Sequence, residues 1–228
     1  ILSNPSIHID WDSIDTVLLD MDGTLLDLHF DYHFWTVHLP KKYCQIHHAD
    51  LSEITRYIAS SLEEKQGQLE WYSTDYWSDQ FQLNIIKAQE DIKHLISERA
   101  QALEFLNQLG DMQKKRILIT NSDRPSIQLK FANCKIEPLL DEVISSHDYQ
   151  AAKEQQKFWH YLQGNIDFNP DTTIFIDDSE AVLDSAQQFG IKHLLSIKEP
   201  ISSQLRQADS KYPMVENYLA LFTENSNG

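Results

Sequence analysis

Short apolar segments recur along the chain, each bounded by polar residues. The first covers residues 16–19, and four more follow at residues 116–120, 142–146, 173–177 and 192–197. Short continuous apolar runs that contain β-branched residues are typical of strands buried on both faces. The pattern therefore predicts five buried strands.

Segments with helical periodicity separate most of these strands. They cover residues 100–109, 126–131, 153–162 and 179–189, and glycine follows the first and the last of them, at Gly110 and Gly190. Glycine is common just beyond a helix C-terminus, so both positions support the helix ends. Strands that alternate with helices predict an α/β fold, with a Rossmann-like parallel sheet covered on both faces.

One interval, between the first and second predicted strands, is too long for a single crossover helix. Within it, Leu51, Ile54, Ile58 and Leu62 follow helical spacing, and residues 75–96 have room for one or two more helices. No segment there has a convincing strand pattern. We therefore predict an α-helical insertion over residues 29–97, and a core made of residues 1–28 and 98–228.

Polar residues follow the predicted strands at the edge where ligands bind in open α/β sheets. They are Asp20 and Asp22, Thr120 and Asn121, Asp177 and Asp178, together with Lys153 at the start of a predicted helix. Asp20 and Asp22 are two residues apart, so on an extended strand both side chains point the same way. Carboxylates gathered in this way repel one another unless a cation lies between them, and oxygen ligands suit Mg²⁺.

The charge of the chain narrows the choice of partner. Asp and Glu total 35 against 19 Lys and Arg, a formal net charge of -16. So acidic a chain repels nucleic-acid backbones and anionic membranes, and we expect neither as a partner. A small phosphorylated metabolite remains possible if the site supplies local positive charge. The oligomeric state is left open.

The chain contains no apolar run of the ~18 residues that a membrane-spanning helix needs. Residues 1–11 lack a basic region followed by an apolar stretch, so they do not resemble a secretion signal. We therefore expect a cytoplasmic protein.

The residues at the strand ends resemble the four motifs of the haloacid dehalogenase (HAD) superfamily. Asp20-Met21-Asp22-Gly23-Thr24 resembles its DxDGT motif, Thr120-Asn121 its second motif, Lys153 its third and Asp177-Asp178 its fourth. The four segments occur in the family's order and cover the whole predicted core. The insertion after the first strand is similar to the helical cap of the C1 group of this superfamily.

The resemblance implies a catalytic role for each motif. Asp20 would be the nucleophile that forms an aspartyl-phosphate, and Asp22 the general acid and then the general base. Thr120 and Asn121 would bind the phosphoryl group, and Lys153 would offset its negative charge.

The resemblance also implies a Mg²⁺ site. Its ligands would be the carboxylates of Asp20 and Asp178 and the backbone carbonyl of Asp22. Asp177 would reach the metal through water or orient a ligand.

The lysines leave one alternative open. The family often has glycine or proline beside the third-motif lysine, whereas Lys153 is preceded by Ala152 and followed by Glu154. Lys157 is therefore a second candidate for that lysine. Lys130 and Lys135 precede the third predicted strand, and we expect both on the surface.

Asp22 bears on the reaction type, because an alkoxide leaving group needs a proton whereas a halide does not. It therefore favours phosphate-ester chemistry, although a phosphomutase would use the same residues. Cap aromatics such as Trp71 and Tyr76 are candidates for substrate binding, since aromatic faces stack on nucleobases. The alternative is that Phe34, Trp35, Trp71 and Trp77 pack the cap's own core.

Motifs and cap aromatics together resemble the GMP/IMP nucleotidase branch of the superfamily, which implies a 5′-nucleotidase acting on purine nucleoside monophosphates. Other possibilities are a phosphoglycolate or sugar phosphatase, a β-phosphoglucomutase-like mutase, or a non-catalytic protein with this fold.

Overall fold

A six-stranded parallel sheet forms the centre of the computed structural model, which describes residues 7–204 and 210–223. The strand order is β3-β2-β1-β4-β5-β6, and every neighbouring pair is parallel. The strands are β1 (Thr16–Leu19), β2 (Lys115–Thr120), β3 (Glu142–Ser145), β4 (Thr173–Asp177), β5 (His193–Ile197) and β6 (Met214–Val215). The predicted α/β class and parallel sheet are confirmed.

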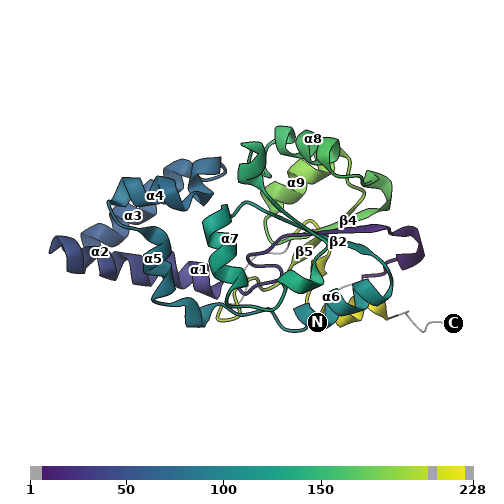
Figure 1. Ribbon diagram of the computed structural model, residues 1–228, viewed down its shortest axis with the longest axis horizontal. Helices are drawn as coiled ribbons and strands as arrows, with labels where there is room; N and C mark the ends of the chain where they lie inside the picture. The colour runs from purple at the N-terminus through teal and green to yellow at the C-terminus, as the bar shows by residue number, and fades with distance from the viewer. Residues whose placement is uncertain (1–6, 205–209, 224–228) are drawn as a thin grey trace.

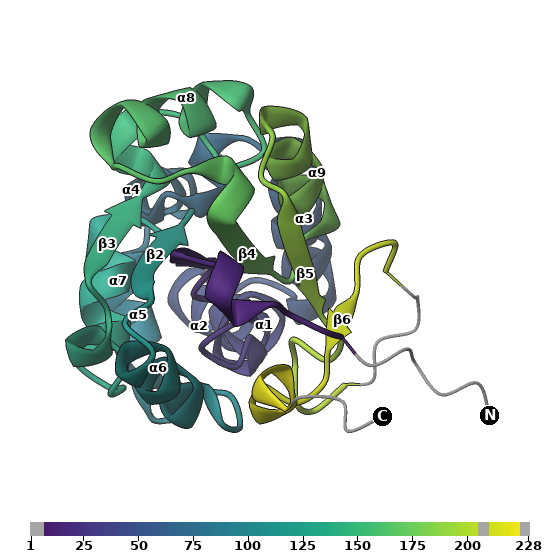
Figure 2. The ribbon, with the colours of Figure 1, turned by 90° about the vertical axis from the view of Figure 1, so that its right-hand side faces the viewer.

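Alternate residues of the central strand face two separate hydrophobic cores. Val17 and Leu19 pack with Phe105 of α6 on one face, whereas Leu18 packs with Trp159 of α8 on the other. Figure 2 shows α8 and α9 on one side of the sheet and α6 on the opposite side. The helices of the core are α6 (Ala102–Asp111), α7 (Arg124–Phe131), α8 (Gln156–Asn165) and α9 (Glu180–Phe189). Burial on both faces explains why the strands are almost continuously apolar.

The direction in which strands are added to the sheet reverses at β1. From β1 the chain moves outward through β2 and β3, and then returns to β4 on the other side of β1. At such a switch point the connections after two adjacent strands leave in opposite directions, which opens a crevice beyond their carboxyl ends.

Helices occupy the long interval between β1 and β2, as predicted. Figure 1 shows them as a lobe beside the sheet. They are α1 (His29–His33), a π-helical turn η2 (Phe34–His38), α2 (Leu39–His47), α3 (Leu51–Lys65), α4 (Thr74–Phe81) and α5 (Ile85–Glu90), with 3-10 turns η3 (Leu69–Tyr72) and η4 (Lys93–Leu95). The two chain segments that enter and leave this lobe run side by side, because Asp27 N–H donates to Ser97 O and Arg99 N–H donates to Leu25 O. The exact division of the chain into core and cap stays a prediction.

A buried carboxylate joins the lobe to the core. Asp123 caps α7 by accepting a hydrogen bond from Ser126 N–H, and its other oxygen accepts from both N–H and Oγ1 of Thr74, at 2.6 Å each. Thr74 is the first residue of α4. One carboxylate therefore satisfies backbone donors at the start of a cap helix and of a core helix.

Two details differ from the sequence prediction. The helix expected from residue 153 begins at Gln156, so Lys153 lies in the preceding turn rather than in the helix. The sheet also has a sixth strand, β6, which the hydrophobic pattern did not indicate because it is only two residues long.

Further 3-10 turns are η1 (Trp11–Ser13), η5 (Glu137–Leu139), η6 (Ser146–Tyr149), η7 (Pro170–Thr172) and η8 (Leu219–Phe222).

Candidate active site

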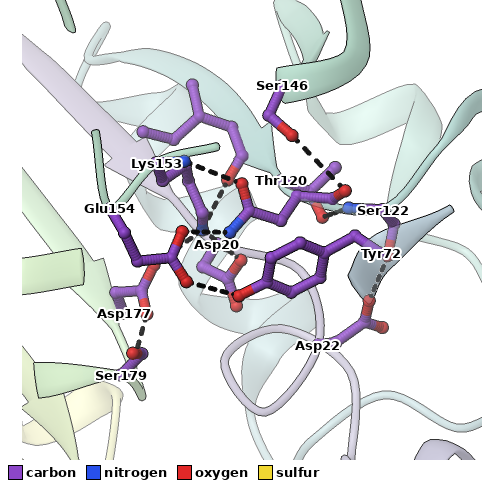
Figure 3. Close-up of polar contacts among 12 residues, drawn as sticks. Asp20, Asp22, Tyr72, Thr120, Ser122, Ser146, Lys153, Glu154, Asp177 and Ser179 are labelled. Atoms are coloured by element: carbon purple, nitrogen blue, oxygen red, sulfur yellow. Dashed lines mark hydrogen bonds and ion pairs between the residues drawn. The ribbon is translucent and has the colours of Figure 1, made fainter. Parts of the chain in front are cut away.

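The predicted site residues of the core line one cavity of about 1000 Å³ between the sheet and the helical lobe. Its floor comes from the segments that follow β1, β2 and β4 and from the turn before α8. Figure 3 shows several of these side chains converging. The core residues that line it include Asp20, Asp22, Thr120, Asn121, Lys153, Asp177 and Asp178.

The ammonium group of Lys153 lies at the centre of this floor. Its Nζ is 2.6 Å from Asp20 Oδ1 and 2.7 Å from Asp177 Oδ2, and the side chain is only 2% exposed. The backbone positions it, because Lys153 N–H donates to Asn121 Oδ1. Lys157, the alternative, is exposed and lies over the ring of Tyr161. The structure therefore brings Lys153, and not Lys157, to the cavity.

The carboxylates of Asp20, Asp177 and Asp178 form a tight cluster, with one oxygen from each within 4.8 Å of the others. Burial raises the pKa of Asp20 to about 7, although Lys153 opposes the shift. Burial, and then the charges of Asp177 and Asp20, raise the pKa of Asp178 well above its usual value. Burial lowers the pKa of Lys153, but the two carboxylates outweigh it and the net shift is upward.

This cluster fits a divalent cation. The cluster has three carboxylates, and Lys153 pairs with only two of them, so negative charge remains in excess. All the available donors are oxygens, as Mg²⁺ prefers. The two oxygens of Asp177 differ from the rest, because Oδ2 pairs with Lys153 and Oδ1 accepts from Ser179 N–H. Asp177 is therefore held by the protein, while Asp20 and Asp178 have oxygens left to offer.

Gly23 allows Asp178 to approach the turn after β1. Its φ is +87°, in the region that favours glycine, and a Cβ at this position would lie 2.6 Å from Asp178 Oδ2. The glycine of the first motif is thus required both by the backbone conformation and by the space that the carboxylate occupies.

Asp22 faces a different set of partners from Asp20. The regular strand ends at Leu19, and both Asp20 and Asp22 line the same cavity. Asp22 Oδ2 accepts a hydrogen bond from Ser122 Oγ at 2.8 Å, and Oδ1 lies 2.7 Å from Lys130 Nζ. Each aspartate of the motif therefore has its own lysine.

Lys130 is buried, and the prediction that it lies on the surface is wrong. Its side chain is 2% exposed, and Nζ lies between Asp22 of the core and Asp31 of α1, with both Asp31 oxygens at 2.9 Å. Burial raises the pKa of Asp31 to about 6, with Lys130 opposing the shift. Burial lowers the pKa of Lys130, and Asp22 and Asp31 more than reverse that change.

Two residues of the second motif organise the loop beside the cavity. Thr120 is buried, and its Oγ1 accepts from Ser122 N–H. Asn121 donates through Nδ2 to Glu154, whose other oxygen accepts from the hydroxyl of Tyr72. The amide of Asn121 thus connects the loop after β2 to the turn that carries Lys153 and Glu154.

Aromatic residues of the cap both pack the interior of the lobe and line the cavity. Trp35, Trp71 and Trp77 all line the cavity, and Trp77 Nε1 donates to Trp71 O. Trp77 also stacks on Phe81 in the interior of the lobe. Tyr76 is not among the described residues that line the cavity, and the ammonium of Lys65 lies over its ring. The structure does not bring Tyr76 to the site, and Tyr72 contributes its ring there instead.

Comparison with known proteins identifies the family of this chain. A model of haloacid dehalogenase-like hydrolases matches residues 17–195. The chain belongs to this family. It is 35% identical over 215 residues to the GMP/IMP nucleotidase YrfG of Escherichia coli, covering 94% of this chain and 97% of that protein, and the same values hold for YrfG of Shigella flexneri.

Solved structures share the fold of this HAD-like hydrolase. A HAD phosphatase from Thermococcus onnurineus superposes with a TM-score of 0.73 at 18% identity, over 88% of this chain and 93% of the other. An L-2-haloacid dehalogenase from Xanthobacter autotrophicus gives a TM-score of 0.56 at 16% identity, over 81% and 78%. Among the residues that the structure describes, no helix has the length and apolar character to cross a bilayer.

Polar residues at or beside this hydrolase's site that the sequence prediction did not single out include Lys130, Tyr72 and Ser122. For Lys130 a signal was present, because it follows buried Ile127 by three positions and so lies on the inner face of α7. For Tyr72, in the 3-10 turn η3, and for Ser122, in the loop after β2, no local pattern indicates that the side chain reaches the site.

Replacing Lys130 by Met should destabilise the protein, because two carboxylates would lose their shared cation in a poorly hydrated site. We expect the free energy of unfolding to fall by about 3 kcal/mol, measured by urea denaturation at neutral pH. Lys135→Met provides a matched control, since Lys135 is exposed and lies five residues further along. Equal stability of the two variants would contradict the buried pairing.

Proposed function

We propose that this HAD-like hydrolase is a Mg²⁺-dependent phosphomonoesterase, and specifically a 5′-nucleotidase that acts on purine nucleoside monophosphates. The observation that carries the phosphatase assignment is the arrangement of Asp20 and Asp22 at one cavity. Asp20 is paired with Lys153, and Asp22 is held separately by Ser122 and Lys130. A nucleophile and a proton donor in distinct environments suit a two-step displacement.

In the first step an Asp20 oxygen attacks phosphorus, and the bond from phosphorus to the ester oxygen breaks. Asp22 gives its proton to the departing alkoxide, which leaves as an alcohol. In the second step Asp22 takes a proton from water, whose oxygen attacks the aspartyl-phosphate and releases inorganic phosphate. Asp20 is then regenerated, and each group has returned to its starting protonation state.

Lys153 has a defined electrostatic task in both steps. Its ammonium group is within 2.6 Å of the attacking carboxylate, so it stabilises charge that shifts between Asp20 and the phosphoryl oxygens. Thr120 lies beside it at the end of β2, where its hydroxyl and the nearby backbone amides are proposed to bind those oxygens.

The proposed metal ligands are the carboxylates of Asp20 and Asp178 and the backbone carbonyl of Asp22. Asp177 is proposed to orient the site, because both of its oxygens already accept hydrogen bonds from the protein. Bound Mg²⁺ would supply positive charge that offsets the carboxylate cluster and the phosphate ester.

The substrate class rests on the nucleotidase relative and on the shape of the cavity. The E. coli protein at 35% identity is named as a GMP/IMP nucleotidase. The cavity here has a charged floor and a roof that includes Trp35, Trp71 and Trp77, and its volume suits a small metabolite. Such a roof gives a flat base an apolar surface while the phosphate lies on the floor.

Asp20→Asn should abolish turnover, because a carboxamide is a poor nucleophile. We expect kcat for phosphate release from GMP to fall by at least about 1,000-fold. The matched control is Asp12→Asn, at an exposed position of η1. Full activity of Asp20→Asn would show that another residue attacks phosphorus.

Gly23→Ala should weaken metal binding, because its Cβ would displace the Asp178 carboxylate. We expect the Mg²⁺ concentration for half-maximal activity to rise about 10-fold or more, and excess chelator to abolish wild-type activity. Gly164→Ala is the control, since nothing lies within 4 Å of its added Cβ. Wild-type activity that survives the chelator would refute the metal requirement.

A panel of phosphate monoesters tests the substrate class. We expect kcat/KM for GMP and IMP to exceed that for phosphoglycolate and sugar phosphates by at least about 10-fold. Preference for phosphoglycolate or sugar phosphates would replace the nucleotidase by another metabolite phosphatase. Isomerised sugar phosphate among the products would indicate a mutase instead.

A further inference from the structure

A buried polar group in the cap has no partner within the described protein. Gln89 belongs to α5 and is 2% exposed, and it lines the same cavity as Asp20. Its Oε1 atom is buried and accepts no hydrogen bond from any residue that the structure describes. Buried polar side chains in folded proteins are almost always hydrogen-bonded, so a group like this at a cavity wall is suited to a ligand.

The surroundings of Gln89 narrow the chemistry of that ligand. The roof of the same cavity includes Trp35, Trp71 and Trp77, and α5 packs against α4, the helix that carries Trp77. Aromatic side chains bind the faces of a nucleobase, and carboxamides bind its edge. The opposite side of the cavity carries the carboxylates and Lys153, where a phosphate group would be attacked.

A carboxamide is matched to the edge that guanine and hypoxanthine have in common. It presents an acceptor oxygen beside a donor N–H₂ group. Both bases present an N1–H donor beside the O6 acceptor, so one glutamine can pair with either base through two hydrogen bonds. A phosphate ester without a base lacks this paired N–H donor and carbonyl acceptor.

We propose that Gln89 hydrogen-bonds to the N1–H and O6 edge of a 6-oxopurine and is a specificity-determining residue for nucleotides over base-free phosphate esters. This inference rests on the proposed nucleotidase function and deepens it. Gln89 acts on binding of the base, at the cap, and takes no part in the transfer of the phosphoryl group.

The chain offers a matched control on the same cavity. Gln66 also lines it, but the residue is exposed, so water satisfies its amide when no ligand is bound. Gln89→Met and Gln66→Met make the same chemical change, with little change in size, at a buried and at an exposed position.

The experiment compares kcat/KM for three substrates: IMP, purine riboside 5′-monophosphate and ribose 5-phosphate. The second has the shape of IMP but lacks O6 and the N1–H donor, and the third lacks the base. We expect the wild-type enzyme to favour IMP over purine riboside monophosphate by about 10- to 100-fold, since a buried acceptor would lose its partner. In Gln89→Met the two nucleotides should become equal while ribose 5-phosphate hydrolysis is unchanged, and Gln66→Met should keep the wild-type ratio.

Several outcomes would overturn the inference. Equal wild-type activity on IMP and purine riboside monophosphate would do so without any variant, and so would a wild-type ratio in Gln89→Met. Equal loss of all three activities in Gln89→Met would indicate that the residue only packs the cap. Wild-type preference for ribose 5-phosphate over both nucleotides would refute the proposed nucleotidase function and this inference together, whereas the other outcomes leave that function intact.

Discussion

The ammonium group of Lys153, buried between Asp20 and Asp177, is the interaction on which the floor of the site depends. The two carboxylates end adjacent strands of the sheet, β1 and β4, so the fold forces them close together in a poorly hydrated place. Without a cation between them they would repel each other. The surrounding structure holds the lysine in place, because its backbone bonds to Asn121 and its carbonyl accepts from Trp159 Nε1.

A second buried ammonium group, that of Lys130, connects the core to the cap. It lies between Asp22, which follows β1, and Asp31, which belongs to α1. Asp123 makes a second connection, to the start of α4. Both connections begin on or beside α7, so the position of the cap and the position of Asp22 are linked through one helix. A change that moves the cap is thus expected to move the proposed proton donor as well.

These two lysines reduce the negative charge at the proposed site of a chain whose net charge is -16, although the carboxylates still outnumber them. Lys153 lines the cavity, whereas Lys130 is buried behind it, against Asp22 and Asp31, which both line the cavity. Charges in such a place are poorly screened and act over short distances, whereas the exposed acidic residues are screened by solvent and salt. Local charge at the cavity therefore matters more for a small ligand than the total.

The sequence by itself was sufficient for the α/β class, the parallel sheet and the helical insertion, because apolar runs and helical periodicity report burial directly. It also singled out Asp20, Thr120, Lys153, Asp177 and Asp178, which the structure brings to one cavity, since residues at the carboxyl ends of parallel strands necessarily share an edge. The strand β6 was not predicted, because two residues are too few to show a periodic pattern.

Only the tertiary structure decided which side chains meet across segments distant in the chain. Lys130 is buried because α7 packs against the cap and two carboxylates surround it, whereas Lys135 is exposed. Tyr72 reaches the site and Tyr76 does not, although both stand in the same aromatic segment. Gln89 is buried at the cavity wall through the packing of α5. Local sequence patterns record whether a face is buried, but the partner of a polar group depends on contacts between helices and loops that no local pattern encodes.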